Sequence, residues 1–219
     1  MKFKRNKIVA KLKGGLGNQL FIYFTAYVLS KKNFDLEIDI SLFKNQNLRS
    51  LSIDFLPIKL YNYKFLDFLT FTKLKEKNPF LYSKLSVSKN YNYVLDGYFQ
   101  NEEYFKEHRD EIIKMFIGNE EPLKPLKNTV AVHVRRGDYL LKKNKDFHGL
   151  LSLSYFNKSI NYLKQKNSDY VFLFFSDDIN FCKQNFKGDN VFFVEQGTEL
   201  SDLKRMMNCQ HFIISNSSY

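Results

Sequence analysis

Short apolar stretches alternate with segments of helical periodicity through the second half of the chain, and this alternation limits the possible fold most. The stretches with the length of buried strands are 129–134, 170–175, 191–194 and 212–214. Between the first two, apolar side chains recur on one helical face at Leu153, Phe156, Ile160 and Leu163. Strands joined by such helices predict an α/β fold with a doubly wound parallel sheet.

The same pattern continues to the end of the chain and is present, with more interruptions, at its beginning. After 175 we expect a short helix following Asp178 and a longer one over 199–208. In the first half the expected strands are 8–12, 36–40 and 94–99. The expected helices there begin at Asn18 and run across 105–116, while residues 42–95 predict only short helices.

The segment 118–128 separates the two halves. It holds two of the four prolines in the chain, and proline is common where regular structure is interrupted. We therefore expect two Rossmann-like lobes, 1–120 and 128–219. The sequence ends soon after the last expected strand, and a parallel strand normally needs a following helix to cover it. The second lobe is therefore expected to be truncated and incomplete.

Composition places the chain among folded proteins but leaves the meaning of its charge open. Hydrophobic residues make up 44% of the sequence, which is enough for a core and excludes a disordered chain. The net charge of +11 favours anionic partners. However, 28 of the 34 basic residues are lysines scattered along the chain, as a biased genome composition would also produce.

Targeting signals are not evident in the sequence. Lys11 and Lys13 interrupt the only apolar stretch near the basic N-terminus, so no signal peptide is predicted. Nothing approaches the ~20 apolar residues of a membrane span. Cys182 and Cys209 form no CxxC motif and are interpreted as buried free thiols. We expect a cytoplasmic protein whose lysine surplus allows peripheral contact with an anionic membrane face.

A glycine-rich segment, Gly14-Gly15-Leu16-Gly17-Asn18-Gln19, lies between the first expected strand and helix. Glycine permits close approach of a ligand to the backbone, and a helix N-terminus offers N–H groups to an anion. The segment matches neither GxGxxG nor GxxxxGK[ST], so neither a dinucleotide fingerprint nor a Walker loop is supported. It is either a ligand-binding loop or simply a tight turn.

The segment His133-Val134-Arg135-Arg136-Gly137-Asp138 carries two of the six arginines at the carboxyl end of an expected strand. Open α/β sheets bind ligands at that edge, and a guanidinium suits phosphate oxygens. If the strand continues, His133 and Arg135 share one face and converge on a diphosphate. Arg136 then anchors the site from behind, against Asp138. The alternative is a pair of Arg–Asp salt bridges at a strand end.

Other chemistry-bearing residues give weaker signals. Ser176-Asp177-Asp178 precedes a helix, where Ser or Asp is first of all an N-cap. No DxD motif occurs, and the histidines are too scattered for a zinc site, so no metal site is expected. His148, in the loop after the arginine pair, is either a catalytic or acceptor-binding element or a structural residue.

The ordered motifs together resemble the bacterial form of the α-1,2-fucosyltransferase family, glycosyltransferase family eleven. The motifs that carry the resemblance are Gly14-Gly15-Leu16-Gly17-Asn18-Gln19-Leu20-Phe21, His133-Val134-Arg135-Arg136-Gly137-Asp138-Tyr139, Phe147-His148-Gly149, Phe175-Ser176-Asp177-Asp178, and Asp202-Leu203 through Cys209 to Ser215-Asn216-Ser217-Ser218. The resemblance implies a GT-B-like fold, with an acceptor-side first lobe and a donor-binding second lobe. It implies GDP-L-fucose as donor and inverting transfer to the 2-hydroxyl of a terminal galactose, with no metal or other cofactor.

The resemblance also implies roles for individual residues. Arg135 would bind the β-phosphate and stabilise the leaving GDP, with Arg136 and His133 beside it in the donor site. Asp202, Ser217 and Ser218 fall where related enzymes hold the guanine and the diphosphate. Gly15, Gly17 and Asn18 would face the donor from the first lobe. For the base on the acceptor hydroxyl, the candidates are Asp138, Asp146 and His148, and the sequence does not choose among them.

Two other functions are compatible with the sequence. A truncated relative could bind only a nucleotide-sugar or a glycan and be inactive. The charge and the many aromatic residues would suit a nucleic-acid binder, but no RNP-like, helix-turn-helix or zinc-finger pattern occurs, so no nucleic-acid partner is expected. The acceptor stays open among O-antigen, capsule and free oligosaccharide, and the expected setting is synthesis of a bacterial surface polysaccharide.

Overall fold

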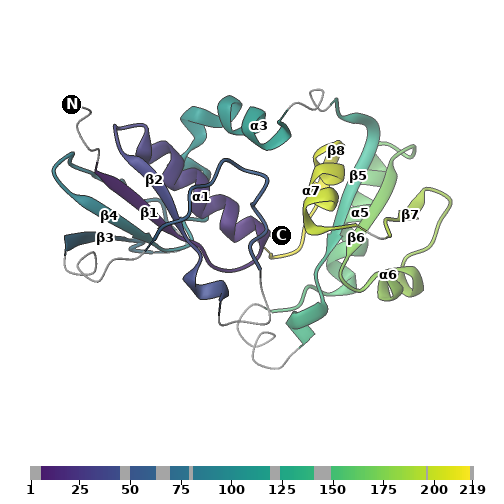
Figure 1. Cartoon of the computed structure of the whole chain (residues 1–219). Coiled ribbons are helices and arrows are strands. Elements are labelled where there is room, and N and C mark those ends of the chain that lie inside the picture. The colour runs from purple at the N-terminus through teal and green to yellow at the C-terminus, as the bar shows by residue number, and fades with distance from the viewer. Residues whose placement is uncertain are drawn as a thin grey trace. The chain divides into compact units, whose positions relative to one another are not determined.

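The computed structural model describes residues 6–44, 50–62, 70–78, 81–118, 124–140, 149–195 and 197–217 (Figure 1). The chain divides into two compact units, Met1–Glu121 and Pro122–Ser217, called the N-terminal and C-terminal units below. Each unit contains a four-stranded sheet whose strands all run parallel. In the part of the chain that the structure describes, no helix is long and apolar enough to cross a membrane.

The sheet of the N-terminal unit has the strand order β2-β1-β4-β3. Its strands are β1 (Lys7–Lys11), β2 (Asp35–Asp39), β3 (Phe71–Lys75) and β4 (Asn92–Asp96). The helices are α1 (Leu16–Ser30) and α3 (Arg109–Ile117), with short 3₁₀ helices at Ser41–Phe43, Glu102–Tyr104 and Lys106–His108. The chain passes from β1 to β2 on one side of β1, while β4 lies on the other side of β1. The carboxyl ends of β1 and β4 therefore mark a topological switch point.

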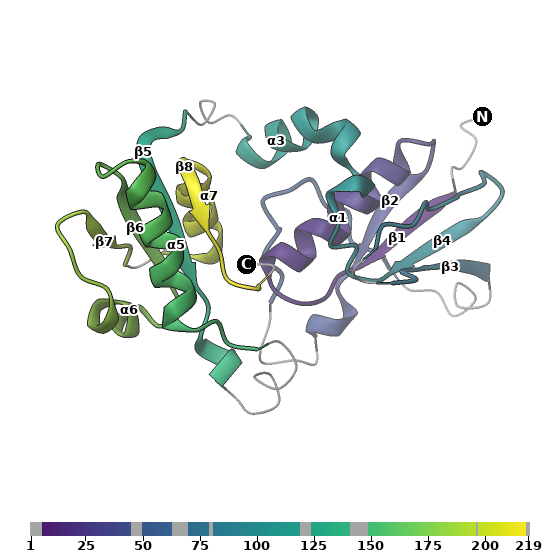
Figure 2. The same ribbon diagram turned by 180° about the vertical axis from the view of Figure 1, so that it is seen from behind.

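The C-terminal unit has the strand order β7-β6-β5-β8. Its strands are β5 (Leu126–Val134), β6 (Val171–Ser176), β7 (Val191–Phe193) and β8 (Cys209–Ile213). A 3₁₀ helix spans Gly137–Leu140, and the α-helices are α5 (Leu153–Lys166), α6 (Ile179–Asn185) and α7 (Glu199–Met207). Figures 1 and 2 show α5 and α7 on opposite faces of the sheet, so this unit is doubly wound. The chain passes from β7, on one side of β5, to β8, on its other side. The switch point of this sheet therefore lies between β5 and β8.

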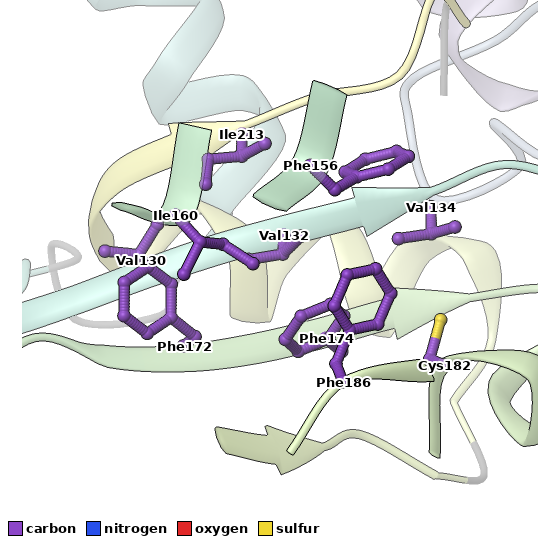
Figure 3. Close-up of a cluster of buried hydrophobic side chains, with 10 residues drawn as sticks. All are labelled: Val130, Val132, Val134, Phe156, Ile160, Phe172, Phe174, Cys182, Phe186 and Ile213. Carbon is purple, nitrogen blue, oxygen red and sulfur yellow. The ribbon is translucent and has the colours of Figure 1, made fainter. Parts of the chain in front are cut away.

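Alternating side chains of β5 and β6 build the core of the C-terminal unit (Figure 3). Every second residue of β5 faces the helices α5 and α6, because side chains alternate between the two faces of a strand. The buried cluster consists of Val130, Val132, Val134, Phe156, Ile160, Phe172, Phe174, Cys182, Phe186 and Ile213. Phe174 lies at its centre, with its ring centroid 4.6 Å from that of Phe186. This packing holds the carboxyl ends of β5 and β6 side by side.

The predicted α/β class with parallel sheets is confirmed. The expected strands and helices of the second half all form, although β5 and β8 begin three residues earlier than expected. Phe212, inside β8, and Ile214, directly after it, are each more than half exposed. Both cysteines are buried free thiols, as expected.

Three expectations for the first half are wrong in detail. The strand expected over 94–99 spans Asn92–Asp96, because Phe99 has a φ of +52° that no strand accommodates. The helix expected across 105–116 begins only at Arg109, after two 3₁₀ turns. The stretch 42–95 contains the strand β3, whose alternating lysines and exposed position at the sheet edge hid it from the apolar pattern.

Truncation of a central core side chain should destabilise the C-terminal unit. We expect Phe174→Ala to lower the free energy of unfolding by about 3–5 kcal/mol, because it removes a fully buried ring and leaves a cavity. Phe192→Ala is the matched control, since Phe192 in β7 is 51% exposed and should cost under about 1 kcal/mol. Urea unfolding of the three proteins measures the difference, and equal midpoints would contradict this description of the core.

Candidate functional site

The arginine pair of the C-terminal unit lies at the switch point of its sheet. Arg135 and Arg136 directly follow β5, and Asp177 directly follows the neighbouring β6. Ser215 lies two residues beyond β8, on the other side of β5. Because the strands are parallel, all these residues gather at one edge of the sheet, where open α/β sheets bind their ligands.

Arg135 is held from three directions. Its Nη1 atom lies 3.0 Å from Asp177 Oδ2, and its guanidinium carbon lies 5.7 Å from the centroid of the Tyr139 ring. Its backbone N–H donates to Ser215 Oγ at 3.0 Å, and the Ser215 hydroxyl donates to the His133 carbonyl at 2.8 Å. The Ser215 hydroxyl thus joins the ends of β5 and β8. The Arg135 side chain is only 16% exposed, so its direction is set before any ligand arrives.

Arg136 is joined to the start of α6. Its Nε–H donates to Asp178 Oδ2 at 3.1 Å, and its guanidinium carbon lies 3.5 Å from the centroid of the Phe181 ring. Asp178 Oδ1 accepts a hydrogen bond from the Phe181 N–H at 3.2 Å, so the expected N-cap at this position is confirmed. The structure shows Asp178 as a partner of Arg136, whereas the side chain of the expected partner, Asp138, lies outside the described residues. β5 ends at Val134, as expected, so Arg135 and Arg136 lie beyond the strand.

Asp177 connects the two arginines, a role that sequence reasoning missed. One carboxylate oxygen pairs with the Arg135 guanidinium, and the other accepts the Arg136 backbone N–H at 2.9 Å. The Arg–Asp salt bridges left open as an alternative are therefore present. A guanidinium has five N–H donors, more than one carboxylate can accept, so such pairing is compatible with anion binding. The contact could have been anticipated from the sequence, because residues that follow two neighbouring parallel strands lie next to each other.

Gly137 provides the space that Asp177 occupies. A Cβ atom added at Gly137 would collide with Asp177 Oδ2, so a larger residue there must displace the carboxylate. Ser176 supports the same arrangement from the other side: its hydroxyl donates to the Val134 carbonyl at 2.7 Å and accepts the Asp178 N–H at 3.0 Å. The ends of β5 and β6 are thus joined by side chains beyond the last backbone pairing.

His133 lies one residue before the end of β5 and is 8% exposed. Burial lowers its pKa to about 4, with a further contribution from the Arg135 charge, while Asp177 acts in the opposite direction. The imidazole is therefore neutral at pH 7. A neutral ring adds no like charge beside Arg135, which keeps the positive charge of the site on the guanidinium groups.

Asp202 lies in the first turn of α7, whose N-terminus carries a capping box between Thr198 and Ser201. Asp202 Oδ1 is buried without a hydrogen-bond partner, and Arg205 Nη1 lies 3.8 Å from it. Burial raises the pKa of Asp202, and the Arg205 charge offsets part of the effect. A buried carboxylate oxygen that lacks a donor is suited to accept one from a ligand. The predicted contact with a guanine stays a prediction.

The remaining predicted site residues are distributed over both units. Ser217 follows Asn216, whose carbonyl accepts the Tyr139 hydroxyl at 3.3 Å. Gly15, Gly17 and Asn18 belong to the N-terminal unit, where α1 already begins at Leu16, so the glycine-rich loop is shorter than expected. His148, Asp146, Ser218 and the side chain of Asp138 lie outside the described residues. Within the described ranges, no group of three or more His, Cys, Asp or Glu is placed to hold a metal ion.

Comparison with known proteins defines the family. The model of glycosyl transferase family 11 matches residues 2–219, so the chain belongs to that family and is a glycosyltransferase. An alpha-1,2-colitosyltransferase of Escherichia coli is 34% identical over 97% of this chain and 84% of its own length. The O-antigen biosynthesis glycosyltransferase WbnK of Escherichia coli is 27% identical over 95% of this chain and 86% of its own. Among solved structures, NodZ alpha-1,6-fucosyltransferase co-crystallised with GDP aligns with 96% of this chain and 88% of its own, at 14% identity and a TM-score of 0.49. The family resemblance seen in the motifs is confirmed.

A double-mutant cycle tests the packing of Gly137 against Asp177. Gly137→Ala should lower the free energy of unfolding by about 1–3 kcal/mol, because the added methyl group displaces Asp177 from Arg135. In an Asp177→Ala background the same change should cost much less, since the colliding carboxylate is gone. Urea unfolding of the four proteins gives the coupling. Strictly additive effects would show that the two residues do not constrain each other.

The buried neutral His133 predicts a pH dependence of stability. The unfolded side chain has a pKa near 6.5 and the folded one a pKa of about 4, so between these values the unfolded chain binds the proton first. The stabilisation is complete above about pH 6.5 and is lost as the pH falls toward 4, by at most about 3 kcal/mol. Urea unfolding of wild type and His133→Gln across this range isolates the effect, because carboxylates titrate in both. Parallel pH profiles would contradict the assignment.

Proposed function

We propose that this glycosyltransferase moves L-fucose from GDP-L-fucose to the 2-hydroxyl of a terminal galactoside, with inversion at the transferred carbon. The observation that carries the proposal is the preorganised Arg135 guanidinium at the switch point, paired with Asp177 and bonded through its backbone to Ser215. The family membership supports the reaction class. The α-1,2 linkage in the name of the colitosyltransferase supports the regiochemistry, and the fucose-like character of its sugar supports the donor class.

Charge complementarity explains how the site would lower the barrier. Glycosyl transfer passes through an oxocarbenium-like transition state, and negative charge develops on the departing diphosphate. Arg135, held within hydrogen-bond distance of Asp177, would meet that charge without reorganising. Arg136 supports it indirectly, since its contacts with Asp178 and Phe181 fix the start of α6 beside the site. The base that removes the proton from the acceptor hydroxyl stays a prediction among Asp138, Asp146 and His148.

GDP-colitose is a second candidate donor, to be compared directly with GDP-L-fucose. The relative that is 34% identical over 97% of this chain is a colitosyltransferase, and colitose is L-fucose without the 3-hydroxyl. A site that hydrogen-bonds the 3-hydroxyl rejects the deoxy sugar strongly, whereas an apolar contact there tolerates it. The ratio of kcat/KM for GDP-fucose and GDP-colitose therefore identifies the natural sugar.

The expected setting is assembly of a bacterial surface polysaccharide, with a galactose-terminated glycan as acceptor. The name of the O-antigen biosynthesis relative supports this setting. Cytoplasmic location and contact with an anionic membrane face remain predictions from the sequence.

Arg135→Ala is the decisive variant. We expect it to lower the transfer rate by about 10²–10³-fold, as removal of a preorganised donor does in other group-transfer sites. Arg109→Ala, on the exposed surface of the N-terminal unit, is the matched control and should transfer at the wild-type rate. Transfer to lactose is measured in EDTA with GDP-fucose and with GDP-colitose, and donor affinity is measured by calorimetry.

The outcomes distinguish the alternatives. Transfer that Arg135→Ala loses and Arg109→Ala keeps would support the proposal. Donor binding by a folded wild type that transfers neither sugar would favour a relative that only binds. A folded chain that binds neither donor would overturn the proposal.

A further inference from the structure

The outer helical layer of the C-terminal unit carries lysines without acidic residues. The helices α5 and α6 pack on the same side of β5 and β6, and together they contain Lys158, Lys164, Lys166 and Lys183 but no Asp or Glu. Lys183 is in an ion pair with Glu195. Among the described residues, the three lysines of α5 form no ion pair, and all three are exposed. α5 therefore presents uncompensated positive charge to the solvent.

The helix on the opposite face of the same sheet is balanced in charge. α7 has Glu199 and Asp202 in its first turn and Lys204 and Arg205 in its last turn. A lysine-rich composition would raise the lysine content of both layers, but it would not remove carboxylates from only one of them. The difference between the two faces therefore indicates an anionic partner for the α5 face.

The acidic residues that border this layer do not lie on α5. Asp178, just before α6, is paired with Arg136. Asp169 and Asp189 lie in the loops that lead into β6 and β7, and the exposed Lys187 lies in the second of these loops. The positive charge of α5 is therefore reduced beyond its C-terminal end but not along its length.

Two tyrosines alternate with two lysines on the outer surface of α5. Tyr155, Lys158, Tyr162 and Lys166 are spaced three or four residues apart, so they form one stripe, called the α5 stripe below. Tyr162 is 60% exposed and Tyr155 is 37% exposed. Lys166 Nζ lies 5.3 Å from the centroid of the Tyr162 ring. The stripe thus places aromatic rings and ammonium groups side by side at the surface.

The chemistry of the α5 stripe fits the surface of an anionic lipid bilayer. Tyrosine is enriched where a membrane meets water, because its ring is apolar and its hydroxyl is polar. A lysine side chain lays its apolar stem along such a surface and keeps its ammonium group among the polar groups. In Figure 2, α5 lies on the outside of its unit along its whole length, so a flat surface can contact the entire stripe.

A bilayer on the α5 stripe leaves the arginine site open. The Tyr155 hydroxyl donates to the Ile214 carbonyl at 3.0 Å, so α5 begins beside the carboxyl end of β8. The stripe runs from there along the side of the sheet, whereas Arg135 lies at the carboxyl edge itself. Docking and sugar transfer would therefore use different surfaces of the unit.

We propose that the α5 stripe, with Lys164 beside it, docks this protein reversibly on an anionic lipid bilayer. The lysine surplus of the sequence predicts membrane contact without a location, and this inference gives it one. It does not depend on which sugar is transferred or on which glycan accepts it.

Vesicle binding tests the role of the lysines. The folded full chain is sedimented with vesicles of phosphatidylcholine, alone or mixed with phosphatidylglycerol, and the partition coefficient is measured. Wild type should bind only the mixed vesicles, and binding should weaken as salt is added. Replacement of Lys158, Lys164 and Lys166 together by alanine should weaken binding about fivefold for each lysine, which is on the order of a hundredfold for the three.

A second triple variant controls for net charge. Lys32, Lys77 and Lys84 are exposed in the N-terminal unit, and their replacement by alanine removes the same charge from other surfaces. This variant should bind the mixed vesicles nearly as wild type does. Equal losses in the two triple variants, no binding by wild type, or equal binding to both kinds of vesicle would overturn the inference.

A tryptophan at position 162 reports the contact itself. The chain contains no Trp, so Tyr162→Trp introduces a single fluorophore. Its emission should shift to shorter wavelength on mixed vesicles and be quenched by brominated lipid, because the ring enters the membrane interface. Phe192→Trp is the matched control. Phe192 is 51% exposed and pairs with Leu173, between two residues of β6 that face the α5 core, so its emission should not change.

The same signal separates the bilayer from other anionic partners. Duplex DNA and polyglutamate are added in place of the vesicles, and the Tyr162→Trp emission is recorded again. A shift with either polymer and none with mixed vesicles would overturn the inference, as would an unshifted Tyr162→Trp emission in vesicle-bound protein.

Discussion

Two adjacent guanidinium groups at the end of one strand repel each other, and carboxylates at the end of the next strand hold them in place. The register of β5 and β6 pairs Val134 with Ser176, so the residues that follow these two positions meet in the same order. Asp177 therefore reaches Arg135, and Asp178 reaches Arg136. The direction of the guanidinium that would meet a departing diphosphate depends on this pairing.

The two units share one topological feature. In each, a parallel sheet changes the direction of its connections at a central strand, and side chains gather at the carboxyl edge of that strand. The C-terminal unit places arginines there, supported by Asp177 and a neutral His133. The N-terminal unit places Asp96, Lys13 and Tyr98 there.

Much of the fold could be predicted because burial leaves a periodic trace in the sequence. The centre of β5, from Val130 to Val132, is apolar and fully buried, β6 is apolar from Val171 to Phe175, and α5 shows a clear apolar face. The edge strand β3 was missed because Lys73 and Lys75 reach solvent and break the pattern. The end of β4 was misplaced because the φ of Phe99 depends on the hydrogen bond that its N–H donates to the carboxylate of Glu76, 23 residues away.

The features of the candidate site likewise divide into those that the sequence indicated and those that only the structure revealed. The sequence by itself determined that an arginine pair follows a strand, that Asp178 begins a helix, and that the ordered motifs belong to one glycosyltransferase family. Only the tertiary structure decided that Asp178 is the partner of Arg136, that Gly137 makes room for Asp177, and that Tyr98 faces outward. The physical reason is that local propensity and burial act through near neighbours along the chain. Ion pairs and steric limits at a sheet edge depend instead on the register between strands some 40 residues apart.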